Sequence, residues 1–326
     1  MTPNRSRRAL LASGAATLVA GAFPQLAFAQ PRTVRLILPN ATGSGVDAIA
    51  RAAQPALSKF LNAAVVVENL PGAGGVVGLQ TLARSAPDGN TLSIVSNNVV
   101  IFPSVIKSLP FQMPGDFTPI AKIGETPMVL VVNPNKVPVK DCGELIALLK
   151  RKPNELNYGS GGNGTILHLA TELFLERAGA TARHVPYKGV GPMVTDLMGG
   201  QIDFATTALP SVQGQIKSGA LRPIGVLTAE RAQAAPDIPT LAEQGLQGFS
   251  VEAWFALIGP KGMSQAGVNK AHEAVVTAFA DSQVQEAMVR QGNTIAIGTP
   301  EQAQAAFKSE LAKYAALVKK VGLEPQ

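Results

Sequence analysis

The sequence predicts an α/β protein with two domains and a cleft between them. Short apolar runs rich in β-branched residues alternate with segments of helical spacing, which is typical of βαβ units around a parallel sheet. A chain of 326 residues is long enough for two domains. Extended connections near residues 120–130 and 245–256 separate blocks that each contain complete βαβ units. We therefore expect the chain to leave the first domain, build the second and return, which makes a hinge.

These two crossings set the expected domain boundaries. Residues 30–125 and 249–326 would form the first domain, which is discontinuous in sequence, and residues 126–248 would form the second. In open α/β sheets, ligands bind beyond the carboxyl ends of the strands. A binding site is therefore expected in the cleft between the two sheets.

The strands are expected where short runs combine apolar and β-branched residues. In chain order they are 34–38, 64–67, 91–95, 128–132, 157–158, 182–186, 202–205, 222–227 and 254–258. Helices are expected between them, where apolar residues recur every three or four positions. In chain order they are 46–60, 76–85, 142–151, 165–178, 192–199, 211–218, 268–280, 283–291 and 300–321. The last has the spacing of a long amphipathic helix, which indicates docking against the rest of the fold.

The first 29 residues have the three parts of a secretory signal peptide. Arg5, Arg7 and Arg8 form a basic region, residues 9–22 are small and apolar, and Ala27-Phe28-Ala29 has the A-x-A pattern of a cleavage site. We expect export to the periplasm and cleavage after Ala29, which would leave 297 of the 326 residues. The adjacent pair Arg7-Arg8 also resembles a twin-arginine signal, so that route and the general export route both stay open.

Charge and cysteine content exclude several classes of protein. The formal net charge is +6, and loss of the three signal-peptide arginines would lower it to +3, which is too weak for a nucleic-acid-binding surface. Cys142 is the only cysteine, so no intrachain disulfide can form and no cysteine near the cleavage site can carry a lipid. After the signal, no apolar run approaches the roughly 20 residues of a membrane helix. We expect a soluble monomer that does not bind nucleic acid.

Three glycine-rich loops each follow an expected strand and lead into an expected helix. They are residues 39–47, 69–75 and 159–165. Glycine lets the backbone approach a ligand closely, and a helix N-terminus offers unpaired N–H groups and a partial positive charge. Such loops bind anions without a basic side chain. Three of them at successive strand ends predict one shared site for a small anion.

The same loops permit an alternative interpretation, an exported NAD(P)-dependent oxidoreductase. Gly43-x-Gly45-x-x-Ala48 and Gly159-x-Gly161-x-x-Gly164 both fit the dinucleotide fingerprint. Two features count against it. Several residues separate the first strand from Gly43, and Asp47 would face the negative pyrophosphate.

No arrangement of residues in the sequence composes a reaction, so we expect a binding protein and not an enzyme. His168, His184 and His272 lie far apart and lack the spacing of metal ligands. No G-x-S-x-G elbow occurs, and nothing around Cys142 indicates a nucleophile. We expect no catalytic residue, no metal and no cofactor.

An ordered series of motifs resembles the Bug-type receptors, which are extracytoplasmic solute-binding proteins associated with tripartite tricarboxylate transporters. The series consists of residues 67–75, 158–165 with His168, 184–189 and 196–203. The resemblance runs from about Arg35 to the C-terminus and is far more specific than any single loop. It implies the two-domain periplasmic binding protein (Venus-flytrap) fold, with two crossing strands that let it close over a small carboxylate. It also implies a membrane transporter or a sensor as partner.

In that family, backbone amides and bridging water at the first and third loops hold one ligand carboxylate. The segment after Asp203 selects the ligand, and its hydroxyls here favour a neutral or acidic distal group over an ammonium. Thr165 is placed to cap its helix, with a hydroxyl that either accepts from the N–H of His168 or turns towards the ligand, and we favour contact with the ligand. The expected ligand-binding residues are Asn40, Ala41, Thr42, Gly43, Asp47, Gly74, Asn97, Ser160, Gly161, Thr165, His168, Gly189, Thr206 and Thr207.

Overall fold

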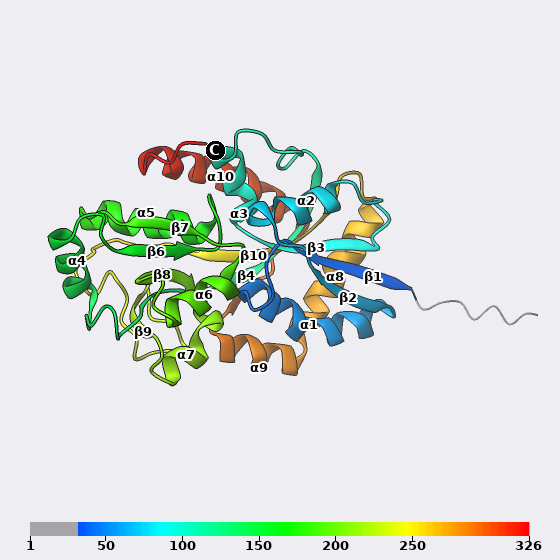
Figure 1. Ribbon diagram of the computed structural model, residues 1–326. Coiled ribbons are helices and arrows are strands. Elements are labelled where there is room, and N and C mark those ends of the chain that lie inside the picture. The colour runs from blue at the N-terminus through cyan, green and yellow to red at the C-terminus, as the bar shows by residue number, and fades with distance from the viewer. Residues whose placement is uncertain (1–31, 326) are drawn as a thin grey trace, which may run out of the picture. The chain divides into compact units, whose positions relative to one another are not determined.

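The structure is a computed structural model that describes residues 32–325. The predicted signal peptide and its cleavage point after Ala29 lie outside the described residues. Two sheets form the cores of two domains, as expected, and Figure 1 shows each sheet with its helices. Both sheets are mixed and not purely parallel as the βαβ pattern predicts, because β10 and β5 run antiparallel to their neighbours.

The first sheet has six strands in the order β11-β4-β10-β3-β1-β2. β1 pairs in parallel with β2 and β3, whereas β10 runs antiparallel to both β3 and β4. Its strands are β1 (Thr33–Leu38), β2 (Ala64–Asn69), β3 (Thr91–Ser96), β4 (Phe117–Thr126), β10 (Ala253–Pro260) and β11 (Thr294–Ile295). Its helices are α1 (Gly45–Leu61), α2 (Val76–Ala83), α3 (Asn98–Val105), α8 (Gln265–Ala280), α9 (Ser282–Gln291) and α10 (Pro300–Lys320).

The second sheet has five strands in the order β7-β6-β8-β5-β9. β6 is parallel to β7 and β8, and β5 is antiparallel to β8 and β9. Its strands are β5 (Met128–Val132), β6 (Asn157–Ser160), β7 (Arg183–Pro186), β8 (Phe204–Ala208) and β9 (Arg222–Val226). Its helices are α4 (Cys142–Arg151), α5 (Ile166–Ala178), α6 (Val190–Met198) and α7 (Gln213–Lys217).

The chain passes between the two sheets at Pro127, which alone separates β4 from β5, and returns to the first sheet where β10 begins at Ala253. The single tryptophan, Trp254, follows Ala253 and is 5% exposed. Its indole N–H donates to Glu310 of α10 at 2.9 Å, and its ring lies 5.3 Å from that of Phe307. The returning strand is thus fixed to the C-terminal helix close to the crossing.

Most of the elements lie where the sequence predicts them, and β5 and α4 begin and end at the expected residues. Two strands and one α-helix were not predicted. α3 is a continuous apolar run that contains Pro103, so it lacks a helical period. β4 was expected only as an extended connection, and β11 is two residues long. The exact domain boundaries stay a prediction.

Candidate functional site

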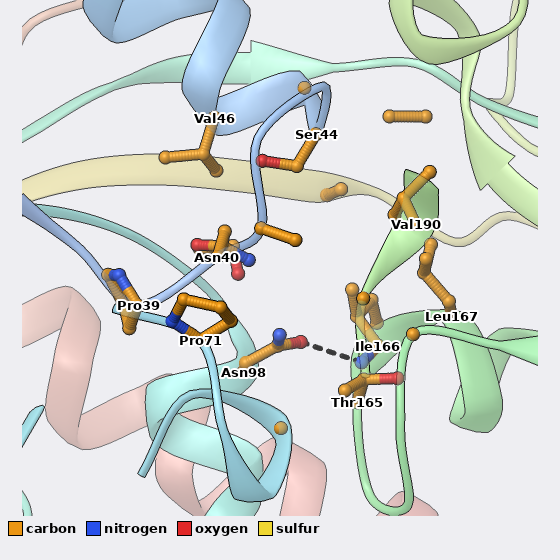
Figure 2. A pocket seen from close by; sticks show the side chains of 18 of the residues that line it. Pro39, Asn40, Ser44, Val46, Pro71, Asn98, Thr165, Ile166, Leu167 and Val190 are labelled. Atoms are coloured by element: carbon orange, nitrogen blue, oxygen red, sulfur yellow. Dashed lines mark hydrogen bonds between the residues drawn. The ribbon is translucent and has the colours of Figure 1, made fainter. Parts of the chain in front are cut away.

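A largely apolar cavity of about 80 Å³ lies where loops of both domains meet. Figure 2 shows its walls, to which α1 and the β1–α1 loop contribute from the first domain and α5 and α6 from the second. The lining residues are Pro39, Asn40, Ala41, Ser44, Gly45, Val46, Pro71, Gly72, Gly74, Ser96, Asn98, Thr126, Met128, Gly161, Thr165, Ile166, Leu167, Lys188, Gly189, Val190, Ala208 and Ala253. One water needs roughly 10–15 Å³ of such space, so the cavity has room for a small molecule only.

Three helix N-termini meet at this cavity. The residues that precede α1, α5 and α6 are Ser44, Thr165 and Gly189, and all three line it. The first N–H groups of a helix lack intrahelical acceptors and lie at the positive end of the helix dipole. The arrangement therefore offers backbone donors and positive potential from both domains to one small volume, which suits an anion.

Each N-terminus is shaped by its local sequence. The Ser44 hydroxyl accepts from the Asp47 N–H at 3.2 Å, and the Thr165 hydroxyl accepts from the His168 N–H at 3.4 Å. Gly189 has φ +117° and offers no side-chain cap. The N–H groups at the start of α6 are therefore left to backbone or ligand acceptors.

Glycines let the two domains approach closely around the cavity. A Cβ on Gly189 would lie 2.4 Å from the Cβ of Ala41 in the first domain. A Cβ on Gly45 of α1 would lie 3.0 Å from that of Ala208 in the second. Because the first of these distances is far below van der Waals contact, Gly189 is required by the packing and by its backbone conformation.

Asn98 is the polar side chain that bridges the two domains at the cavity. It is the first residue of α3, is 8% exposed, and accepts a hydrogen bond at Oδ1 from the Ile166 N–H of α5 at 2.7 Å. This bond is the dashed line in Figure 2. With Oδ1 engaged in this way, the amide nitrogen of Asn98 stays available as a donor.

Six of the expected ligand-binding residues line the cavity and eight do not. Those that line it are Asn40, Ala41, Gly74, Gly161, Thr165 and Gly189. Those that do not are Thr42, Gly43, Asp47, Asn97, Ser160, His168, Thr206 and Thr207.

Asp47 holds the first glycine-rich loop in place through hydrogen bonds. Its carboxylate accepts from the Gly43 N–H, Arg51 and Asn69, each at 3.0 Å. Burial raises the pKa of Asp47, but these hydrogen bonds outweigh burial and hold the pKa below its ordinary value. Asp47 is 4% exposed and is not among the residues that line the cavity, so it fixes the loop.

Asn97 and Thr206 form structural hydrogen bonds of their own, whereas the buried Thr207 hydroxyl has no hydrogen-bond partner among the described residues. Asn97 donates to the Tyr314 hydroxyl at 2.6 Å and to the Glu252 carbonyl at 3.0 Å. Thr206 accepts from Thr171 at 3.0 Å, and both Thr206 and Thr207 are fully buried. Within this segment it is Ala208, at the end of β8, that reaches the cavity.

The Thr165 hydroxyl is engaged by hydrogen bonds within its own loop. The hydroxyl donates to the Gly162 carbonyl at 2.9 Å while it accepts from the His168 N–H. The structure therefore shows the capping arrangement, although the residue itself lines the cavity.

Sequence reasoning missed Lys188, the one charged residue among those that line the cavity. It is exposed and directly precedes Gly189 at the start of α6. Lys188 lies within the motif of residues 184–189, but a lysine in a loop is usually solvated, so the residues around it do not indicate a place at the cavity. Ser96 and Thr126, at the ends of β3 and β4, are further polar lining residues that were not expected.

The described part of the chain, residues 32–325, holds no group of three or more His, Cys, Asp or Glu side chains that could bind a metal ion. Over the same residues, no helix combines the length and apolar character that a membrane crossing requires.

Comparison with known proteins places this geometry among transport receptors. The model of the tripartite tricarboxylate transporter family receptor matches residues 49–323. The protein BugT of Bordetella pertussis is 36% identical over 293 residues, which cover 89% of this chain and 90% of BugT.

Solved structures give the same result. The periplasmic binding protein BugD is 31% identical, with a TM-score of 0.86 over 90% of this chain and 99% of BugD. The R. palustris protein Rpa4515, solved with adipate, is 29% identical, with a TM-score of 0.87 over 90% of this chain and 99% of Rpa4515.

Proposed function

Because the chain belongs to the family of tripartite tricarboxylate transporter receptors, we propose that its cavity captures a small carboxylate and that both domains take part in the capture. The observation that carries this proposal is the meeting of three helix N-termini, from α1, α5 and α6, at one small cavity. A carboxylate there would accept hydrogen bonds from backbone N–H groups and would lie at the positive ends of helix dipoles.

The remaining lining indicates what the rest of the ligand is like. Val46, Met128, Ile166, Leu167 and Val190 give apolar walls, which suit a short carbon skeleton. Lys188 adds one positive charge at this wall. A small organic acid with an apolar body therefore fits the cavity better than an amino acid, whose ammonium would lie near positive potential.

A dinucleotide does not fit. About 80 Å³ is space for roughly six waters, which suits a small acid and is far too little for a dinucleotide. Gly43, the first glycine of the fingerprint, does not line the cavity. The oxidoreductase interpretation is therefore not supported. We infer that the protein binds without turnover, because its polar lining consists of amides, hydroxyls and one lysine.

The same family membership supports an exported protein that hands its ligand to a membrane transporter or a sensor. The finer elements of this proposal are cleavage after Ala29, the export route, the monomeric state and the nature of the partner. Sequencing of the N-terminus of protein recovered from the periplasm should begin at Gln30 or within a residue or two. An intact Met1 would contradict export with cleavage.

A thermal-shift screen tests the function. Adipate, malate, other mono-, di- and tricarboxylates, NAD and NADP would each be added in excess to the purified protein. A ligand that binds only the folded state adds about 2.7 kcal/mol of stability at a hundredfold excess over its Kd. We expect saturable shifts with one or more carboxylates and none with the nucleotides. Shifts with NAD or NADP and none with any acid would overturn the proposal.

A further inference from the structure

Two histidines stack directly behind the third glycine loop. The rings of His168 (α5) and His184 (β7) lie 3.8 Å apart and 12° from parallel, and Tyr158 of β6 stacks on His184 at 4.9 Å. Neither histidine lines the cavity. They come from different elements, and their stack lies beneath the turn that joins β6 to α5.

Each histidine holds one end of this loop. The Nε2 atom of His184 is 2.6 Å from the Ser160 hydroxyl, which in turn accepts from the Gly162 N–H at 3.2 Å. The Nδ1 atom of His168 accepts from the Gly164 N–H at 3.1 Å. Gly162 and Gly164 have φ of +134° and +70°, which other residues rarely adopt. A loop of such residues is intrinsically flexible, so side chains are needed to fix it.

The hydrogen bond from Gly164 determines which ring nitrogen of His168 carries the proton. An N–H donates to Nδ1, so Nδ1 carries a lone pair and the ring proton is on Nε2, which faces Glu172 at 3.9 Å. Protonation of Nδ1 would place its N–H opposite the Gly164 N–H, and the hydrogen bond between them would be lost. Burial, followed by repulsion from His184, lowers the pKa of His168 to about 3, and burial lowers that of His184 to about 4.

Burial, and not an ion pair, keeps these histidines neutral. On α5, Glu172 accepts from the Tyr158 hydroxyl, and burial raises the pKa of Tyr158 further above its ordinary value. On the outer side, Lys107 and Glu324, of opposite charge, line the same surface hollow as His168. On the side of the loop, the two rings contact the Ser160 hydroxyl and the Gly164 N–H, neither of which is charged.

We propose that His168 and His184 are positioning residues that hold loop 161–164, and with it the N-terminus of α5, in the geometry that captures the anionic group of the ligand. The identity of that group rests on the proposed function. The positioning itself does not, and it can be measured in protein without ligand.

The first experiment follows the loop by NMR in ligand-free protein. His168→Leu removes the acceptor of Gly164, whereas His168→Asn places an amide oxygen near the position of Nδ1. His184→Leu and His184→Gln form the equivalent pair for Nε2. His272→Gln is the control, because His272 lies on α8 and contacts the Gly298 carbonyl at 2.9 Å. We expect the leucine variants to speed hydrogen exchange of the 161–165 amides at least about tenfold, and the other three to change it less than about threefold.

A pH titration of the unchanged protein keeps the proposal testable if a leucine variant does not fold. The amide signal of Gly164 should move with the same apparent pKa as the ring nitrogens of His168, well below pH 6.5. Independent titration of the two, or wild-type exchange in a folded His168→Leu protein, would overturn the proposal.

The second experiment measures affinity for adipate by calorimetry at pH 7.5. We expect at least a tenfold weaker Kd in either leucine variant, with recovery to within about threefold in His168→Asn and His184→Gln. Unchanged affinity in folded leucine variants would overturn the proposal. If the unchanged protein does not bind adipate, that result counts against this ligand of the proposed function, and loop exchange alone decides the positioning role.

Discussion

Asn98 and Ile166 join the two domains directly, because Oδ1 of Asn98 on α3 accepts a hydrogen bond from the backbone N–H of Ile166 on α5 at 2.7 Å. This N–H is one of the donors at the N-terminus of α5. The same side chain therefore contributes both to the contact between the domains and to the wall of the cavity.

Replacement of Asn98 should separate these two contributions. Asn98→Asp keeps an acceptor for Ile166 and places a negative charge at a helix N-terminus, which the helix dipole favours and burial of the carboxylate opposes. The same charge would repel an anionic ligand, so we expect at least a tenfold weaker Kd, which is about 1.4 kcal/mol. Asn98→Ala should instead lower the free energy of unfolding by about 1 kcal/mol. Urea denaturation and calorimetric titration measure the two effects, and an aspartate variant that binds the acid as tightly as wild type would contradict the role in the ligand site.

Gly189→Ala should impair closure around the ligand. The new Cβ would lie 2.4 Å from that of Ala41 across the domain contact, at a residue with φ +117°. Gly219→Ala is a matched control, since Gly219 has φ +74° but no atom within 4 Å of the added Cβ. Both variants should lose about 1–3 kcal/mol of stability from backbone strain. Only Gly189→Ala should also weaken carboxylate binding, by tenfold or more in a calorimetric titration, and equal affinity in the two variants would refute the closure argument.

Stability should fall on acidification from about pH 6.5 to pH 5. The pKa values of His168 and His184 are lowered to about 3 and about 4 in the folded chain, so the unfolded chain binds more protons in this range. The free energy of unfolding then decreases as pH falls, by at most about 1.4 kcal/mol per pH unit for each group. Urea titrations at several pH values measure the slope. Replacement of both residues by His168→Asn and His184→Gln should flatten it, whereas His272→Gln should not.

Thr165→Val should affect stability more than affinity. Its hydroxyl donates to Gly162 and accepts from His168, so it is engaged within the loop. We expect a loss of about 1 kcal/mol in the free energy of unfolding, typical of a lost N-cap, and less than a threefold change in Kd. Thr165→Ser should restore the stability. A tenfold weaker Kd in the valine variant would instead show that the hydroxyl turns to the ligand.

The sequence predicts the fold well and the site only in part. Strands such as Met128–Val132 are short apolar runs between turn signals, which is a local pattern. The glycine loops are local as well, and parts of all three line the cavity. The roles of Asn97 and Asn98 could not be separated, because α3 has no helical period. Once α3 forms, one side chain points to Tyr314 and its neighbour points to the cavity.

Sequence patterns do not predict which residues of the two domains come into contact. The pairs Ala41–Gly189 and Asn98–Ile166 join residues that are far apart in the chain, and their contact depends on how closely the two domains approach. Lys188 was missed for the same reason. Its place at the cavity is set by the packing of α6 against the first domain and not by its neighbours in sequence.

The position of Trp254 gives the protein a built-in optical reporter. This residue is the only tryptophan in the chain, follows the cavity-lining Ala253, and is hydrogen-bonded to Glu310 of α10. Any movement of β10 relative to α10 would alter the polarity around one indole, and no second indole would obscure the signal. Emission from this single fluorophore would report any such movement on ligand capture without a dye, and rapid mixing would resolve its time course.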